Sequence, residues 1–158
     1  MRTRSLREGF TLIELLVVMA VLGILAMAAM SLAEVSVQRD REQELRRGLW
    51  QIRDAIDAYK RAVDVGSVAV SAGASGYPPS LQALVEGVPN AKVAGQTQYF
   101  LRRVPRDPFA EESVSAVESW GLRSYTSSAE SPRPGADVYD VYSRSSKVGL
   151  NGVALRDW

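Results

Sequence analysis

The chain has 158 residues, which suits one small domain and one additional long helix. Its 19 lysines and arginines nearly balance its 18 acidic residues, so it lacks the basic surplus with which nucleic-acid-binding proteins hold phosphates. It contains no cysteine and no histidine, which excludes disulfides, thiolate catalysis, Cys/His zinc sites and a histidine general base. G-x-S-x-G, Ser-x-x-Lys and phosphate-loop motifs are also absent from the sequence, and we expect no enzymatic activity.

The first 33 residues divide into a basic segment and an apolar segment. Residues 1–9 contain three arginines and one glutamate, and residues 10–33 are apolar almost throughout. A helix rises about 1.5 Å per residue, so the apolar segment is long enough to cross a hydrocarbon layer about 30 Å thick. Since a basic flank stays on the cytoplasmic side, we predict a cytoplasmic N-terminus, a transmembrane helix over residues 10–33 and an exported domain over residues 34–158.

A secretory signal peptide is the usual alternative for a basic segment followed by an apolar one. Here the apolar run is long for a signal peptide, and no small-x-small cleavage site with a polar break ends it. The pattern continues instead into an amphipathic helix. These features favour a helix that stays in the protein.

Glu14 is the one acidic residue of the apolar segment. A carboxylate at membrane depth costs a few kcal/mol or more unless it is paired, by the order of magnitude of insertion scales. The position of Glu14 near the start of the segment therefore predicts a partner close to the helix N-terminus. A membrane anchor that tolerates one interfacial glutamate is the simpler alternative.

The heptapeptide GFTLIEL at residues 9–15 resembles the processing site of the type IV pilin and type II secretion pseudopilin family. The resemblance implies that a prepilin peptidase cuts between Gly9 and Phe10, removes the leader at residues 1–9 and methylates the new amine of Phe10. It also implies that Glu14 pairs with the terminal amine of a neighbouring subunit when a filament assembles. In a medium of low dielectric such a pair favours one axial register between subunits.

The segment from Ser31 to Val65 has the pattern of an amphipathic helix. Apolar residues follow one another at alternating spacings of four and three, which places them on one face: Leu45, Leu49, Ile52, Ile56, Tyr59 and Val63. No proline interrupts residues 10–65, so we predict one long helix. A two-stranded coiled coil is less favoured, because the repeat is short and strand-like segments follow that need a helix to cover them.

The remainder of the chain predicts loops, one short helix and a small sheet. Ser80 is a typical N-cap for a helix over residues 81–86, which Gly87 ends. Strand-forming residues occur at 120–125, 138–142 and 153–155, and Asn151-Gly152 indicates a type I′ turn. We therefore predict an α+β fold of the type IV pilin kind, with the long helix packed on an antiparallel sheet of about three strands.

Two further segments, at residues 77–84 and 99–109, resemble the G-type major pseudopilin of type II secretion systems. The resemblance implies a structural subunit of a periplasmic filament that drives protein export across the outer membrane. It places the chain in the inner membrane as a single-pass protein with a periplasmic C-terminal domain. The implied partners are further copies of the chain, the prepilin peptidase, an inner-membrane assembly platform and minor pseudopilins. Residues 110–135 are not explained by this resemblance.

Two other functions stay open at this point. One is a type IV pilin for adhesion, motility or extracellular electron transfer. The other, from a different class, is a membrane-anchored exported binding module or enzyme that keeps its leader and forms no filament.

The C-terminal segment, residues 141–158, resembles the loop in which G-type pseudopilins hold a calcium ion. Candidate ligands at the corresponding positions are Ser143, Ser146, Asn151 and Asp157. Calcium takes about six to eight oxygen ligands, several of them from carboxylates, whereas this set has one carboxylate. Arg144 and Lys147 add positive charge that opposes a dication. We therefore expect a hairpin without metal and no cofactor, with calcium as the alternative.

Overall fold

The computed structural model describes residues 11–158, except for the side chains of residues 28–33. The chain divides into two compact units, residues 1–39 and residues 40–158. Helix α1 (Leu12–Asp64) contributes residues to both units. The predicted long helix is thereby confirmed between these bounds, while Phe10 lies outside the described residues.

In the first unit, helix α1 presents apolar side chains on all sides. The large apolar residues between Leu12 and Met27 are exposed by 46 % to 80 % of their surface. None of the helical stretches in the described part of the chain combines the length and the hydropathy needed to cross a bilayer. The segment predicted to span the membrane, residues 10–33, includes Phe10 and the side chains of residues 28–33, which lie outside this description.

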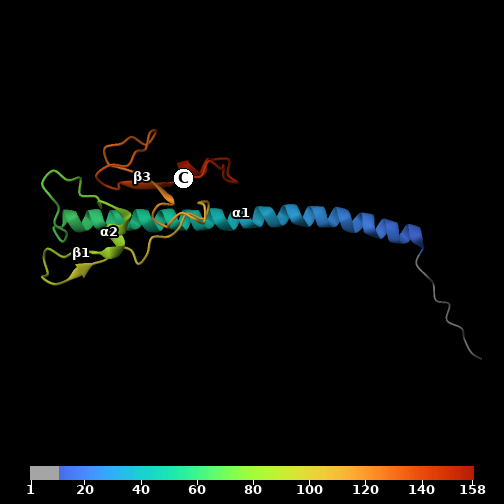
Figure 1. Ribbon diagram of the computed structural model, residues 1–158, viewed down its shortest axis with the longest axis horizontal. Coiled ribbons are helices and arrows are strands. Elements are labelled where there is room, and N and C mark those ends of the chain that lie inside the picture. Colours follow the sequence, from blue (N-terminus) through green and yellow to red (C-terminus); the bar gives the residue numbers. More distant parts are fainter. Residues whose placement is uncertain (1–10) are drawn as a thin grey trace, which may run out of the picture. The chain divides into compact units, whose positions relative to one another are not determined.

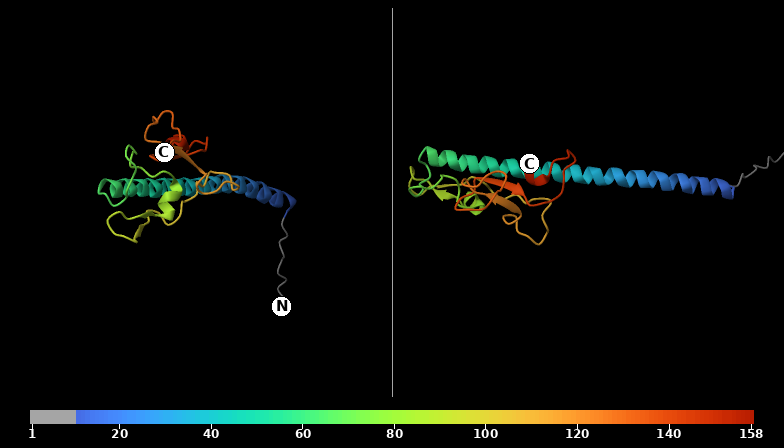
Figure 2. Two further views of the ribbon diagram at one scale, coloured as in Figure 1. Left: turned by 60° about the vertical axis from the view of Figure 1, so that its left-hand side comes forward. Right: turned by 90° about the horizontal axis from the view of Figure 1, so that it is seen from above.

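In the second unit, α1 carries one buried face, and the predicted stripe is this face. Leu45, Leu49, Ile52, Ile56 and Tyr59 are all buried, and Val63 packs against them at the edge of the core. The rest of the core comes from the segments that follow α1, including Leu81, Leu84, Trp120, Val141 and Leu155. Viewed from above, these segments lie on the same side of α1 (Figure 2). The apolar side of the helix thus organises the domain, as the spacing predicted.

Helix α2 (Leu81–Glu86) begins and ends where the sequence predicted. The Ser80 hydroxyl oxygen accepts a hydrogen bond from the Ala83 backbone N–H at 3.2 Å. Gly87 ends the helix with φ at 78°, a conformation that glycine adopts without steric cost. Leu81 and Leu84 point into the core. Figure 1 shows α2 beside the second half of α1.

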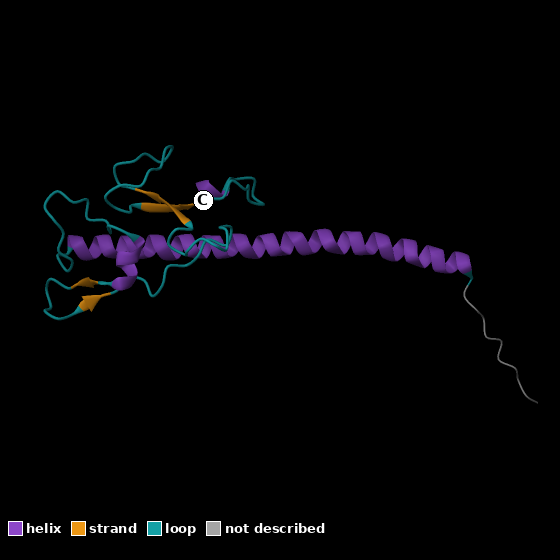
Figure 3. Cartoon of the chain, in the orientation of Figure 1, coloured by secondary structure: helices purple, strands orange, loops and turns teal. Residues whose placement is uncertain are grey.

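The predicted sheet of about three strands is wrong, because the strands form two separate antiparallel pairs. Strand β1 (Val88–Pro89) pairs with β2 (Thr97–Gln98), and β3 (Trp120–Arg123) pairs with β4 (Asp140–Ser143). Long loops connect these short strands, as Figure 3 shows. The first pair escaped prediction because it is two residues long and contains a proline, which donates no ladder hydrogen bond.

The final strand predicted at residues 153–155 is also wrong. Ala154 forms a single bridge with Val148, and the chain then turns into the 3-10 helix η1 (Leu155–Asp157). Leu155 is fully buried in the core, so the segment bends inward to bury this side chain.

The turn at Asn151-Gly152 exists but is not of type I′. Gly149 N–H donates to the Val153 carbonyl at 2.9 Å, and Gly152 N–H donates to the Gly149 carbonyl at 2.9 Å. Gly152 has φ at 78°, whereas no residue other than glycine has a positive φ among those described. A type I′ turn needs positive φ at both central residues. The geometry is instead that of a three-residue hairpin loop, in which glycine alone takes the left-handed position.

Candidate functional site

The start of helix α1 is capped by Thr11, which is part of the predicted processing motif. The Glu14 backbone N–H donates to the Thr11 hydroxyl oxygen at 3.3 Å, and Leu15 N–H donates to the Thr11 carbonyl at 3.2 Å. Thr11 is therefore the N-cap and Glu14 the third helical residue, the spacing of a capping box. This capping role was not predicted, although the Thr-x-x-Glu pattern at residues 11–14 indicates a capping box.

Glu14 therefore has a favourable position on its own helix before any partner is considered. Backbone N–H groups at a helix N-terminus carry partial positive charge, which stabilises a carboxylate in the first turn. The side chain is exposed and surrounded by exposed apolar residues such as Ile13 and Leu15. An acidic group displayed at the start of an apolar helix can receive a cationic group from a second molecule. Gly9 and Phe10, the other two predicted site residues, lie outside the described residues.

The exposed apolar surface from Leu12 to Met27 is much larger than a soluble monomer ordinarily shows. Surfaces of this kind are buried against lipid or against other proteins. This surface and the acidic residue Glu14 in the capped first turn together characterise an N-terminal segment that is suited to association. The segment is followed by a small α+β domain that has its own core. This combination is typical of pilin-like proteins.

Comparison with known families agrees with this class. Residues 4–30 match the model of the prokaryotic N-terminal methylation motif. The match supports a type IV pilin-like protein whose leader is cut by prepilin peptidase and whose new N-terminus is methylated. The motif indicates a membrane-anchored filament subunit, and its family is structural and not enzymatic. Neither the curated proteins nor the solved structures that were compared gave a match.

The four candidate calcium ligands have different local surroundings. Ser143 is fully buried, and its hydroxyl donates to the Asp107 carboxyl at 2.6 Å. Asn151 accepts a hydrogen bond from the Val153 N–H at 3.1 Å within its own turn. Ser146 is exposed, and Asp157 lies beside Arg156 at 3.6 Å. Each candidate thus has separate surroundings, and three of the four already have protein neighbours.

Asp107 holds the C-terminal loop to the middle of the domain. Its carboxyl is buried and accepts hydrogen bonds from the Ser143 hydroxyl and from the Phe109 backbone N–H, the latter at 2.8 Å. Its own backbone N–H donates to the Ser119 hydroxyl at 3.1 Å. The side chain therefore ties the segment before β3 to the end of β4. Sequence reasoning missed it, because the partners stand 12 and 36 positions away.

The surface beside Asp107 contains a cavity of about 410 Å³ that Glu111, Glu118 and Arg144 also line. Hydrogen bonds from the Ser115 hydroxyl and backbone N–H lower the pKa of Glu118. Within residues 11–158, nevertheless, His, Cys, Asp and Glu side chains form no group of three that could hold a metal ion.

Arg53 fastens β4 and the last residue to helix α1. Its Nε donates to Asp140 Oδ1 at 2.8 Å, and its Nη2 donates to the main-chain oxygens of Val141 at 3.1 Å and Trp158 at 2.9 Å. Arg123 makes a second ion pair with Asp140 at 3.3 Å. This arrangement leaves few donors of Arg53 free, and we assign it a structural role.

Proposed function

We propose that the protein is the major pseudopilin of a type II secretion system. The observation that carries this proposal is the N-terminal methylation motif over residues 4–30. The motif includes Glu14, which lies in the first turn of an exposed apolar helix that Thr11 caps. The likeness of residues 77–84 and 99–109 to G-type pseudopilins supports the secretion machine over other users of the motif. The folded α+β domain would then cover the outside of the filament.

The proposal includes a location and a set of partners. The helix over residues 10–33 crosses the inner membrane, with the N-terminus in the cytoplasm and residues 34–158 in the periplasm. Prepilin peptidase cuts between Gly9 and Phe10, and the assembly platform then lifts the subunit into a periplasmic filament with minor pseudopilins. Glu14 pairs with the methylated amine of Phe10 in the next subunit, which relieves the cost of an unpaired carboxylate in a dry environment.

Deletion of the gene tests this function most directly. We expect exported enzymes to accumulate in the periplasm, while any surface filaments of the parent strain persist. The measurement is a comparison of the culture supernatant and periplasmic proteomes with those of the parent, together with electron microscopy of the cell surface. Complementation with the unchanged gene is the control. Unchanged secretion with loss of surface filaments, adhesion or movement would identify a type IV pilin instead.

We further propose that the C-terminal loop is held without calcium, by the Asp107–Ser143 hydrogen bond. Ser143→Ala removes the donor to a buried carboxyl oxygen, and we expect a loss of about 1–3 kcal/mol in the free energy of unfolding. Thermal unfolding of the full chain in detergent measures the loss. Ser146→Ala, at an exposed position, is the matched control and should change stability by less than about 0.5 kcal/mol.

The same unfolding experiment separates this proposal from a calcium site. A ligand that binds only the folded state raises the melting temperature as its concentration increases. Since we propose that the loop holds no calcium, added calcium should leave the melting temperature of the unchanged protein as it was. A rise with calcium and none with magnesium would contradict the proposal. An equal effect of Ser143→Ala and Ser146→Ala would show that the Asp107 contact contributes little.

A further inference from the structure

Trp50 is a large apolar side chain that remains exposed on the surface of the folded domain. The side chain keeps 72 % of its surface accessible on helix α1, whereas Trp120 is fully buried and Trp158 is partly covered. Tryptophan has a large apolar surface and is common at the energetic centres of protein interfaces. Two of the arginines near it are engaged elsewhere, since Arg46 lies over the Trp158 ring and Arg53 binds Asp140. The indole is thus available to a second molecule.

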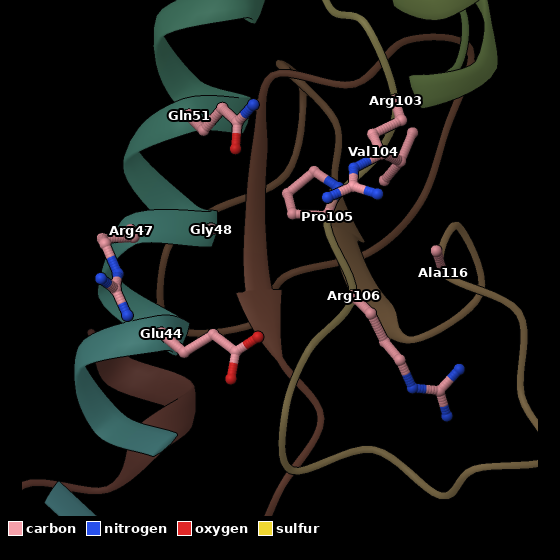
Figure 4. A pocket seen from close by; sticks show the side chains of 9 residues that line it. All are labelled: Glu44, Arg47, Gly48, Gln51, Arg103, Val104, Pro105, Arg106 and Ala116. Atoms are coloured by element: carbon pink, nitrogen blue, oxygen red, sulfur yellow. The ribbon is translucent and has the colours of Figure 1, made fainter. Parts of the chain in front are cut away.

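A groove of about 670 Å³ lies beside α1 in the same unit. Gly48 of the helix, Val104, Pro105 and Ala116 form its apolar surface, while Arg47, Arg103 and Glu44 contribute charged side chains (Figure 4). Clefts of about 300–1,000 Å³ bury small organic ligands, so an indole ring can enter one of this size.

The wall of this groove is fixed by the core of the domain. The Trp120 ring stands directly behind Gly48, so that a Cβ at this position would approach it to 3.2 Å. The Trp120 indole N–H also donates to the Pro105 carbonyl at 2.8 Å. Helix and loop are therefore tied together across the groove. A preformed site of this kind loses little conformational entropy when a partner enters.

Trp50 and the groove lie on different sides of helix α1. At about 100° per residue, Trp50 is turned on average by roughly 110° from the four helical residues that line the groove, with Arg47 the nearest of them at about 60°. One molecule can therefore fill the groove of a second and offer its own groove to a third. A contact between two different surfaces of identical subunits generates rings or open helical filaments.

Charge favours the same pairing. Asp54 lies one helical turn beyond Trp50 on the exposed side, and Arg103 lies at the groove. Neither side chain makes a hydrogen bond or ion pair with another residue among those described. If Trp50 of one subunit enters the groove of another, Asp54 of the first subunit comes close to Arg103 of the second. Such complementarity gives specificity to an interface more than it gives affinity.

We propose that Trp50 of one subunit docks into the groove between Gly48 and Pro105 of the next subunit in the filament. This inference rests on the proposed filament function and adds to it a contact between the α+β domains. The occupant is a second copy of this chain. Burial of the indole would make Trp50 a central residue of the interface, and Trp50→Ala should lower the filament yield about tenfold or more.

Site-directed disulfide formation in assembled filaments tests the contact, and the absence of natural cysteines makes it specific. Two full-length variants with different tags, Asp54→Cys and Arg103→Cys, both of which keep Trp50, are produced together and oxidised after assembly. Since each copy carries one cysteine, a product with both tags reports a contact between copies. Val65→Cys with Arg103→Cys is the control, because Val65 is exposed directly after the end of α1, roughly 16 Å beyond Asp54.

We expect a dimer with both tags from the Asp54 pair and little from the Val65 pair. Filaments without the Asp54–Arg103 product would overturn the contact and leave the proposed function standing. Normal filament yield from Trp50→Ala would overturn it as well. If the unchanged protein is processed and forms no filament at all, the proposed function fails and the contact fails with it.

Discussion

Glu14→Gln should leave the protein processed and folded but reduce filament yield by about tenfold or more. In the proposed filament, the substitution removes the charge that would pair with the Phe10 amine of the neighbouring subunit, and it would leave that ammonium group without a counterion. Breaking one side of a buried ion pair costs about 3–5 kcal/mol, and each factor of ten in an equilibrium constant is about 1.4 kcal/mol. The loss recurs at every subunit addition, so assembly should fail at ordinary protein concentrations.

The geometry of the helix start makes this substitution informative. Thr11 accepts its hydrogen bond from the backbone N–H of residue 14, which glutamine retains. Glutamine is also the usual alternative to glutamate at this place in a capping box. The start of α1 should therefore persist in the variant, and a defect in assembly reports the missing charge. Glu14→Asp, which keeps the charge on a shorter side chain, should recover part of the yield.

Two measurements decide the result. Electron microscopy and shearing of filaments give the yield, and the mass of the membrane-extracted protein gives the processing state. Loss of residues 1–9 with one added methyl group is expected for both the unchanged protein and the Glu14→Gln variant. Normal yield from the variant would refute the pairing role of Glu14. A leader that stays attached in the unchanged protein would favour a membrane-anchored binding module over a filament subunit.

Trp120→Ala should cost about 3–5 kcal/mol in the free energy of unfolding of the α+β domain, the usual cost of truncating a buried aromatic residue. Trp120 is fully buried, and its ring packs against Gly48 of α1. The substitution also leaves the Pro105 carbonyl without its donor at 2.8 Å. For a domain of this size we expect the melting temperature to fall by about 10 °C or more.

Trp50→Ala is the matched control for this experiment. It removes the same side chain from the same domain at an exposed position, and stability should change by less than about 0.5 kcal/mol. Trp120→Phe keeps most of the apolar contact and loses the hydrogen bond, so it should lie between the two. Near-ultraviolet circular dichroism of the full chain in detergent follows unfolding. Equal stability of Trp120→Ala and Trp50→Ala would contradict the core that the structure describes.

The successful predictions depend on short-range signals. The buried face of α1 was evident because apolar residues recur every three or four positions from Leu45 to Tyr59. Helix α2 was evident because its cap and its terminating glycine adjoin it in sequence. Residues 9–15 indicated a pilin-like protein by a motif that is contiguous in the chain. In each case the residues that decide the structure are close neighbours.

Apart from the type I′ turn at Asn151-Gly152, which failed on local backbone geometry, the features that were not predicted correctly depend on contacts outside the local sequence. The paired strands β1 and β2 are too short to leave a periodic pattern, and the last predicted strand bends away to bury Leu155. The buried Asp107 and the Arg53 ion pair connect residues dozens of positions apart. No local sequence pattern identifies a side chain that makes such a contact, because the contact depends on which loops pack beside it in the folded domain.

By itself the sequence determined the association segment, the long helix and its buried face, since spacing and local hydrogen bonding decide these features. Only the tertiary structure decided how the loops close over α1, that Ser143 binds Asp107, and that Trp50 stays exposed on a helix that also lines a groove. The physical reason is that burial is a property of the packed domain. The sequence does not show whether a tryptophan is buried in the core or exposed at an interface, because this depends on the segments that pack around it.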